Sequence, residues 1–400
     1  MQTDNKNQRK YNLILTAGHM GVDLPQGALS AILPYLISAY HFDYATAAVL
    51  VMASNIVGSV VQPIFGQMAD KRNQAWTMVV GLALAGCGIS LTGLISSFPL
   101  LCGSVMIMGV GISMYHPEAA LLVNRLAPGG RQGSAVSVFS FGGNLGFGVG
   151  PIIATAVLSV FDIKGTLAFL AITAAIIAAM AAIYPALKAA HFGVQKPASA
   201  AEDAKPLPQS SEEKPRDNWS GFWRLCGVIF GRSIIYAGFN TFLALYWISR
   251  FHQSNAKGGL MLSAFFIMAA LSTLIGGRLA DSFGHIRMIR VSCIILLPGI
   301  LLLAFADNQI LAFAALVPVA FAISLCYSPT VVLGQSYLAG RKGLASGVTL
   351  GLSVSIGGIV APLLGKIGDA YGLQTTMIVI GLVAIIPLIM SFTLPKTEIR

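Results

Sequence analysis

The stretch GQMADKR at Gly66–Arg72 follows a long apolar run, and a near copy, GRLADSFG at Gly277–Gly284, follows another one. The two copies are 211 residues apart, which is about half of the chain. A repeat period of this length does not indicate a solenoid of short repeats. It indicates two homologous halves, which is a known way of building membrane transporters.

The same offset aligns further residues of the two halves. Pro151 falls on Pro362. The basic turn at Arg131 falls on Lys342. Because one spacing recurs at several separated places, the sequence predicts a tandem duplication of the whole chain.

The composition indicates a membrane protein. Of the 400 residues, 56% are hydrophobic and only 10% are charged, whereas soluble domains carry roughly 25% charged residues. The apolar residues form runs of about 20 or more, long enough for a helix to cross a bilayer. Alternation with period two, which would indicate an outer-membrane barrel, is absent. We predict an all-α membrane protein with twelve transmembrane helices in two pseudo-symmetric six-helix bundles.

Six apolar runs lie in each half. The sequence predicts an N-terminal bundle at 1–188, a linker at 189–218 and a C-terminal bundle at 219–400. The linker is rich in Pro, Ala, Ser and charge, a composition typical of a flexible connection. The predicted spans are 12–38, 45–67, 75–96, 99–122, 133–159, 165–188, 221–249, 258–280, 287–306, 310–338, 343–365 and 373–394.

Lysine and arginine occur mainly in alternate loops, a distribution that sets the orientation of membrane proteins. With the N-terminus in the cytoplasm, the outer segments hold only Lys164, Arg250, Lys257 and Lys366. We therefore expect a multi-pass protein of a bacterial cell membrane with both termini and the linker in the cytoplasm. The net charge of +10 then reflects topology and not binding to nucleic acid. Nothing in the sequence requires an oligomer, so a monomer is expected.

Six plus six helices, a central linker and a duplicated Gly-x-x-x-Asp loop resemble the major facilitator superfamily. Four stretches are similar to its fosmidomycin-resistance efflux group: His19-x-x-x-Asp23, YHPEAA at 115–120, GGRQG at 129–133 and GGNLGFGVGP at 142–151. The resemblance implies two bundles that rock about a central cavity, with proton-driven export.

The duplicated loops are predicted to form a latch on the cytoplasmic side. A glycine at the end of a span lets a neighbouring helix approach closely. A carboxylate four residues later can accept hydrogen bonds from a helix N-terminus or pair with a cation. The alternative is a loop that only sets topology. The predicted gating residues are Gly66, Asp70, Arg72, Arg131, Gly277 and Asp281.

His19 and Asp23 share one face of the first span because they are four residues apart. Asp23 lies near the middle of the span, where a carboxylate is costly unless it faces water or a partner. We predict that Asp23 carries a proton and that His19 is its partner or relay. The alternative is a structural pair that fixes this span to a neighbour.

The fourth span contains two more predicted proton-coupling residues, His116 and Glu118. Pro117 between them frees a backbone carbonyl. Glu118 is either a second protonation site or a partner of Arg125 or Arg131 in the cytoplasmic latch. The residues alone leave both roles open.

Arg232 lies near the middle of the seventh span, and a cation at that depth needs an anionic partner. That partner is either a protein carboxylate, such as Asp23, or an anionic substrate, which guanidinium binds bidentately. Other polar residues in spans line a cavity or bond to neighbouring helices. The predicted substrate-binding residues are Arg232, Tyr236, Asn240, Asn144 and Tyr327.

Motifs for other chemistry are missing. The sequence has no Walker lysine loop, no HExxH and no CxxC, so ATP drive, an enzyme, a metal site and a cofactor are not expected. The leading hypothesis is a proton-coupled exporter of a small drug-like or anionic molecule, such as a phosphonate antibiotic. The alternatives are a proton symporter that imports a metabolite such as an organic acid, and a membrane sensor without turnover.

Overall fold

The computed structural model describes residues 2–71, 74–127, 132–192 and 217–396, and within them the regular structure is helical with no strand. The first half contains α1 (Gln2–Tyr40), α2 (Tyr44–Lys71), α3 (Ala75–Leu91), α4 (Phe98–Arg125), α5 (Gln132–Phe161), the short η2 (Asp162–Leu167) and α6 (Ala168–Phe192). The second half contains α7 (Trp219–Phe251), α8 (Asn255–Phe283), α9 (His285–Phe305), α10 (Gln309–Leu325), α11 (Tyr327–Tyr337), the short η3 (Ala339–Arg341), α12 (Lys342–Tyr371), α13 (Leu373–Val383) and α14 (Ile385–Phe392).

Each predicted span coincides with one helix or with two consecutive helices. The tenth span is divided into α10 and α11 at Cys326, and the twelfth into α13 and α14 at Ala384. Within the described residues, eight apolar helical stretches are long enough to cross a membrane. The all-α membrane fold predicted from hydropathy is therefore confirmed.

Three helices of the second half begin at a residue whose side chain caps the first turn. Asn218 accepts a hydrogen bond from the backbone N–H of Gly221, Ser254 from Lys257 and Asn308 from Leu311. Such side-chain oxygens satisfy N–H groups that have no partner within the helix. The polar residues between the apolar runs thus fix where α7, α8 and α10 start.

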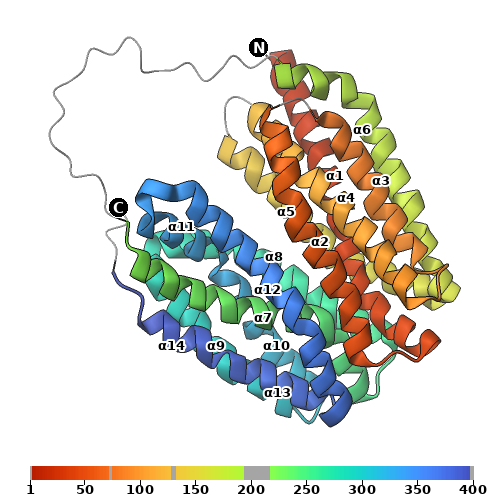
Figure 1. Cartoon of the computed structure of the whole chain (residues 1–400), viewed down its shortest axis with the longest axis vertical. Helices are drawn as coiled ribbons and strands as arrows, with labels where there is room; N and C mark the ends of the chain where they lie inside the picture. The colour runs from red at the N-terminus through yellow and green to blue at the C-terminus, as the bar shows by residue number, and fades with distance from the viewer. Residues whose placement is uncertain (1, 72–73, 128–131, 193–216, 397–400) are drawn as a thin grey trace.

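The helices form two bundles, α1–α6 and α7–α14, which are arranged as a V (Figure 1). The bundles meet at one end, where α2 packs against α12 and α5 packs against α8. They diverge at the other end, which carries the N-terminus, the end of α6 and the start of α7 (Figure 1). The two halves are therefore in contact on one side of the membrane and separated on the other.

Close contact between α1 and α5 depends on the glycines of GGNLGFGVGP. A Cβ atom at Gly142, Gly146 or Gly150 would collide with the backbone of α1. These glycines recur every four residues, so they lie on one face of α5. Small residues of this kind let helices in a membrane pack at close range. The contact fixes the rotation of α1 and thereby the direction of its polar side chains.

Candidate functional site

A buried cluster of two histidines and one aspartate lies at the interface of α1 and α4. Nε2 of His19 is 3.2 Å from Oδ2 of Asp23, and Nε2 of His116 is 3.2 Å from Oδ1 of the same carboxylate. His19 and Asp23 are one turn apart on α1, and His116 comes from α4, just before Pro117. The structure thus brings together three of the four predicted proton-coupling residues.

The other nitrogen of each imidazole is occupied by the backbone. Nδ1 of His19 lies 2.8 Å from the carbonyl oxygen of Phe139, and Nδ1 of His116 lies 2.7 Å from that of Ile112. Because a carbonyl oxygen can only accept, both rings must carry a proton on Nδ1. Each neutral ring then presents a lone pair on Nε2 to the carboxylate of Asp23. Both contacts are favourable only when a proton lies between nitrogen and oxygen.

Apolar and small residues enclose the cluster. The ring of Phe139 stacks on His19 with centroids 4.1 Å apart. The hydroxyl of Tyr115 donates to the carbonyl oxygen of Leu15 at 2.7 Å and so ties α4 to α1 one turn away. A Cβ at Gly143 would collide with both His19 and Asp23. The glycine on α5 therefore leaves the space in which this ion pair forms.

Glu118 is buried but stands apart from this cluster. Its electrostatic neighbours are the backbone N–H of Gln74 and the guanidinium of Arg125. Of the two roles left open by the sequence, the nearby guanidinium of Arg125 agrees with that of a partner of Arg125. Its use as a proton site stays a prediction.

Arg232 on α7 is 5% exposed and lies on the other side of the interface between the halves. Its guanidinium carbon is 5.6 Å from the ring centre of Tyr327. The electrostatic neighbours of Tyr236, one turn along α7, include Arg232, Tyr327 and also Asp23 of the first half. Three of the predicted substrate-binding residues are thus adjacent and lie near the cluster.

The remaining predicted substrate-binding residues have different surroundings. The side-chain oxygen of Asn240 accepts a hydrogen bond from the hydroxyl of Ser30 at 3.1 Å, which joins α7 to α1. Asn144 is half-buried on α5 beside Gly143. The sequence offered Arg232 as one possible partner of Asp23. In the described part of the chain, the ion pairs of Asp23 are with the two histidines of its own half.

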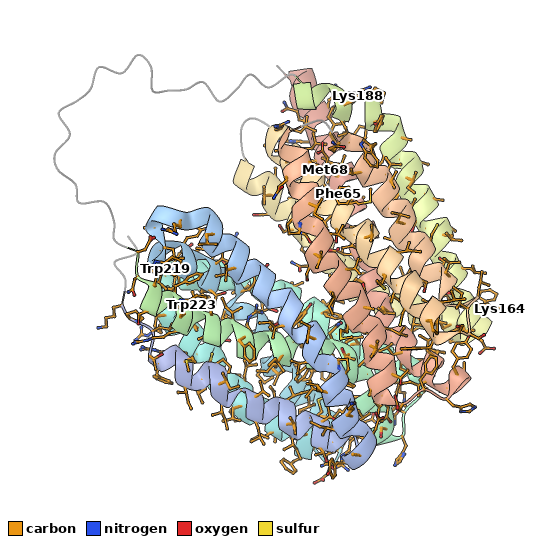
Figure 2. The ribbon with its side chains drawn as sticks, viewed as in Figure 1. Phe65, Met68, Lys164, Lys188, Trp219 and Trp223 are labelled. Atoms are coloured by element: carbon orange, nitrogen blue, oxygen red, sulfur yellow. The ribbon has the colours of Figure 1, made fainter. Side chains whose placement is uncertain are left out.

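The predicted gating residue Gly66 lies between Phe65 and Met68 near the end of α2, and Figure 2 shows these two residues at the divergent end. Among the described residues, no atom lies within 4 Å of where a Cβ would stand at Gly66, and at Gly277 only Oγ of Ser328 does, at 3.6 Å. Asp281 is exposed and lies 3.9 Å from His285. In this conformation neither glycine has a closely packed neighbour. Arg72, Arg131 and the side chain of Asp70 lie outside the described residues.

The meeting end contains a contact that the sequence did not predict. The carboxylate of Asp369, at the end of α12, accepts hydrogen bonds from the backbone N–H groups of Tyr44 at 2.7 Å and Ala45 at 3.0 Å. These are the first N–H groups of α2, so a carboxylate of one half caps a helix of the other. The only sequence signal was an isolated acid near the end of the eleventh span.

A second carboxylate lies at the same helix start. Asp43 accepts a hydrogen bond from the backbone N–H of Thr46 at 2.7 Å. The hydroxyl and the N–H of Thr46 hold the pKa of Asp43 below its ordinary value. The N-terminus of α2 therefore faces two carboxylates, one from each half.

The cluster of His19, Asp23 and His116 also has the donor types of a divalent transition-metal site. One atom from each side chain lies within 4.8 Å of the others. Imidazole and carboxylate bind such ions, and a second-sphere carbonyl on Nδ1 is common in metal sites. Protons and a metal ion are thus the two occupants that an experiment must distinguish.

Comparisons with known proteins agree with this architecture. The family model described as Major Facilitator Superfamily matches residues 15–362 and 225–399. The chain is 27% identical to the fosmidomycin resistance protein of Escherichia coli (strain K12), over 95% of this chain and 91% of that protein. It is 28% identical to the uncharacterized MFS-type transporter YfnC of Bacillus subtilis (strain 168), over 97% of this chain and 94% of that protein.

A solved structure shares the fold. It is a bacterial homologue of the human lysosomal transporter Spinster in an inward-facing, occupied conformation, with a TM-score of 0.79, 15% identity and coverage of 96% of both chains. The helical membrane fold, the two bundles and the match of the family model over most of the sequence lead to one conclusion. The chain belongs to the major facilitator superfamily of transporters.

Proposed function

We propose that this transporter exports a small anionic or drug-like molecule by alternating access and that protons drive the export. The observation that carries the proposal is the cluster of His19, Asp23 and His116, in which both Nδ1 atoms face carbonyl oxygens. Without a proton at this contact, the lone pair of Nε2 faces an oxygen of the carboxylate, and two hydrogen-bond acceptors repel each other. Each contact of 3.2 Å therefore supports a proton held at the carboxylate of Asp23, within α1 for His19 and between α1 and α4 for His116.

The charge of the cluster changes by one unit with each proton. With no proton at either Nε2 contact, the three side chains carry a net charge of −1; with one proton they are neutral, and with two they carry +1. The negative form attracts Arg232 across the interface, and the protonated forms release it. A guanidinium released in this way binds a phosphonate or carboxylate through two parallel hydrogen bonds. Proton binding and anion binding are thereby linked.

The conformation fits the first step of export. With the predicted topology, the divergent end of the V faces the cytoplasm (Figure 1). The outer end is closed by the hydrogen bonds between Asp369 of α12 and the start of α2. Deeper in, the hydrogen bond from Ser30 of α1 to Asn240 of α7 also joins the two halves. A substrate would enter from the cytoplasm between the bundles, and proton exchange at the cluster would accompany the change to the outward-open form.

Drug-sensitive cells that express the chain test this proposal with fosmidomycin as the probe. We expect protection that an uncoupler abolishes and that Asp23→Asn lowers about tenfold or more, because the amide neither takes up nor releases a proton near neutral pH. Asp307→Asn is the matched control, since that acid is 91% exposed and pairs with Arg250 on the outer side. Full protection by Asp23→Asn would overturn proton coupling at this cluster.

The anion site has its own test. Arg232→Ala should lower protection against fosmidomycin while leaving the protein in the membrane at wild-type amount, because the cation that binds the anion is gone. Arg250→Ala, which removes an outer cation, is the control. Unchanged export of the anionic drug by Arg232→Ala would contradict the assignment.

Two other outcomes would redirect the proposal. Uptake of an organic acid into liposomes, stimulated by an inward proton gradient, would favour the symporter that imports a metabolite. Transport that ceases with EDTA and returns with Zn²⁺ would assign the cluster to a metal ion and not to protons.

A further inference from the structure

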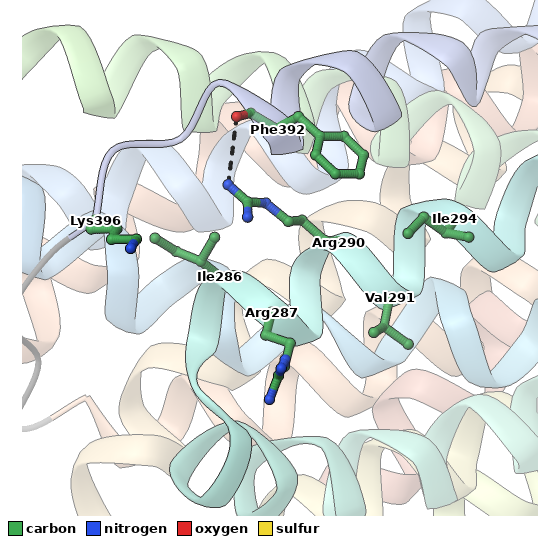
Figure 3. Close-up of a pocket in the computed structure, with 7 residues that line it drawn as sticks. All are labelled: Ile286, Arg287, Arg290, Val291, Ile294, Phe392 and Lys396. Atoms are coloured by element: carbon green, nitrogen blue, oxygen red, sulfur yellow. Dashed lines mark hydrogen bonds between the residues drawn. The ribbon is translucent and has the colours of Figure 1, made fainter.

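A pocket of about 390 Å³ opens on the surface of the second half, between the start of α9 and the end of α14. We propose that this pocket binds an anionic phospholipid, with the phosphate at its cations and an acyl chain along its apolar side. Its lining consists of three cations and four apolar side chains: Ile286, Arg287, Arg290, Val291, Ile294, Phe392 and Lys396 (Figure 3).

The pocket lies at the divergent end of the second half. The start of α7 and the end of α14 lie together there (Figure 1), and Trp219 and Trp223 mark the same end (Figure 2). Trp223 is 63% exposed, and tryptophan is enriched where a membrane meets water. The pocket is therefore at the depth of lipid headgroups, on the side that we assign to the cytoplasm.

Arg290 is held in place by the end of α14. Its Nε donates to the carbonyl oxygen of Ser391 at 3.1 Å, and one Nη donates to that of Phe392 at 3.5 Å. Figure 3 shows the second of these bonds, with Arg290 and Lys396 on either side of Ile286. A guanidinium has five N–H donors, so further donors remain for an external anion. The cation is thus oriented before any ligand binds.

The positive charge of the pocket is not balanced by the protein. In the part of the chain that the structure describes, no carboxylate forms an ion pair with Arg287, Arg290 or Lys396. Both arginines lie in the first two turns of α9, where the positive end of the helix dipole disfavours a cation. An anion bound from outside would offset both effects.

The apolar side of the pocket distinguishes a lipid from a soluble anion. Val291, Ile294 and Phe392 are exposed large hydrophobic residues. The first two follow the arginines along α9, and Phe392 is the last residue of α14. A free phosphate would make no use of them, whereas a phospholipid places its chains beside its charged headgroup. Basic pockets on the cytoplasmic side of membrane helices are suited to anionic headgroups.

The pocket is not part of the duplicated scaffold. At the offset of 211 residues, the positions of Arg287 and Arg290 correspond to Trp76 and Val79 at the start of α3. The first half therefore has no equivalent cations. The charge belongs to the second half alone, so symmetry of the transporter does not explain it.

Native mass spectrometry of the purified full chain tests the proposal independently of transport. The probes are phosphatidylglycerol, phosphatidylcholine with the same acyl chains, and inorganic phosphate. Each cation near a headgroup contributes about fivefold in affinity. The triple variant Arg287→Gln, Arg290→Gln, Lys396→Gln should therefore bind phosphatidylglycerol on the order of 100-fold more weakly.

The triple variant Lys6→Gln, Arg9→Gln, Lys10→Gln is the matched control, because it removes three exposed cations from α1 in the other half. It should bind like the wild type. If the pocket variant does not fold, Arg287→Lys with Arg290→Lys should keep a preference for phosphatidylglycerol, since it keeps the charge. Equal binding of both lipids by the wild type, or displacement of phosphatidylglycerol by millimolar phosphate, would overturn the proposal. Because no substrate is involved, failure here leaves the proposed export untouched.

Discussion

At the scale of single residues, Gly143 decides whether the buried cluster can form. It lies on α5 against His19 and Asp23, at a distance that leaves no room for a side chain. The sequence predicted the importance of His19 and Asp23 from their spacing on one helix. It did not predict that Gly143 belongs to the site, because that depends on how α5 packs against α1.

Gly143→Ala should therefore impair transport without unfolding the protein. The added methyl group pushes the imidazole away from the carboxylate, and overpacking of this kind costs about 1–3 kcal/mol. We expect transport of the probe drug to fall by about tenfold or more at wild-type expression. Gly103→Ala on α4 is the control, because no described atom lies within 4 Å of its Cβ position. A Gly143→Ala protein as active as the wild type would show that the cluster tolerates displacement.

The pairing of His116 with Asp23 was also beyond the sequence. Both residues were predicted to take part in proton coupling, but they lie on α1 and α4, and their register follows only from packing. The sequence also did not predict the hydrogen bonds from Nδ1 of His19 to the carbonyl oxygen of Phe139 and from Nδ1 of His116 to that of Ile112. The spacing of residues along one helix predicts which of them share a face. It does not predict which residues of two different helices are in contact.

At the scale of helices, the contact of Asp369 with the start of α2 is a polar contact between the two halves at the end where the bundles meet. Its two hydrogen bonds join α12 to the first N–H groups of α2. A carboxylate at this position interacts with the positive end of the helix dipole, which is worth about 0.3–1 kcal/mol at an exposed site. If the bundles rock, this contact is present in one of the two conformations and broken in the other. Its strength therefore shifts the equilibrium between the inward-open and outward-open forms.

Asp369→Asn should shift the protein toward the outward-open form, because the amide keeps the shape and loses the charge. A change of about 0.5–1 kcal/mol moves the ratio of the two forms by about two- to fivefold. Spin labels at His41→Cys and Tyr371→Cys in a cysteine-free background would report this shift as a longer component in the distance distribution. Asp307→Asn, on the same side but within one half, should leave the distances unchanged. Identical distributions for all three proteins would remove Asp369 from the outer closure.

At the scale of the whole molecule, hydropathy and duplication predicted the fold well. In the described residues each predicted span coincides with one helix or with two consecutive helices. The offset of 211 residues predicted two homologous halves. Breaks at Cys326 and Ala384 escaped prediction because the apolar pattern continues through them. The sequence did not predict the contacts between the bundles either, because those contacts depend on the conformation of the transporter as well as on its residues.

A reversible cross-link between the bundles tests alternating access directly. Ser30→Cys with Asn240→Cys replaces the hydrogen bond of 3.1 Å between α1 and α7 by a disulfide. Oxidation should abolish transport and reduction should restore it, because the bundles could no longer separate at this level. Ser90→Cys with Thr166→Cys is the control, since these residues bond to each other's carbonyls within the first half. If the oxidised double variant Ser30→Cys, Asn240→Cys still transports, rocking about this contact is excluded.

The carbonyl oxygens at Nδ1 of His19 and His116 have a further consequence for the path of protons. An imidazole conducts a proton along a wire by accepting it on one nitrogen and giving it up from the other. In this conformation Nδ1 of each ring faces a backbone carbonyl oxygen, so a proton that arrives on Nε2 has to depart from Nε2. If the cluster carries protons as we propose, it stores charge without conducting it, so protons do not leak across the membrane through the wall of the bundle.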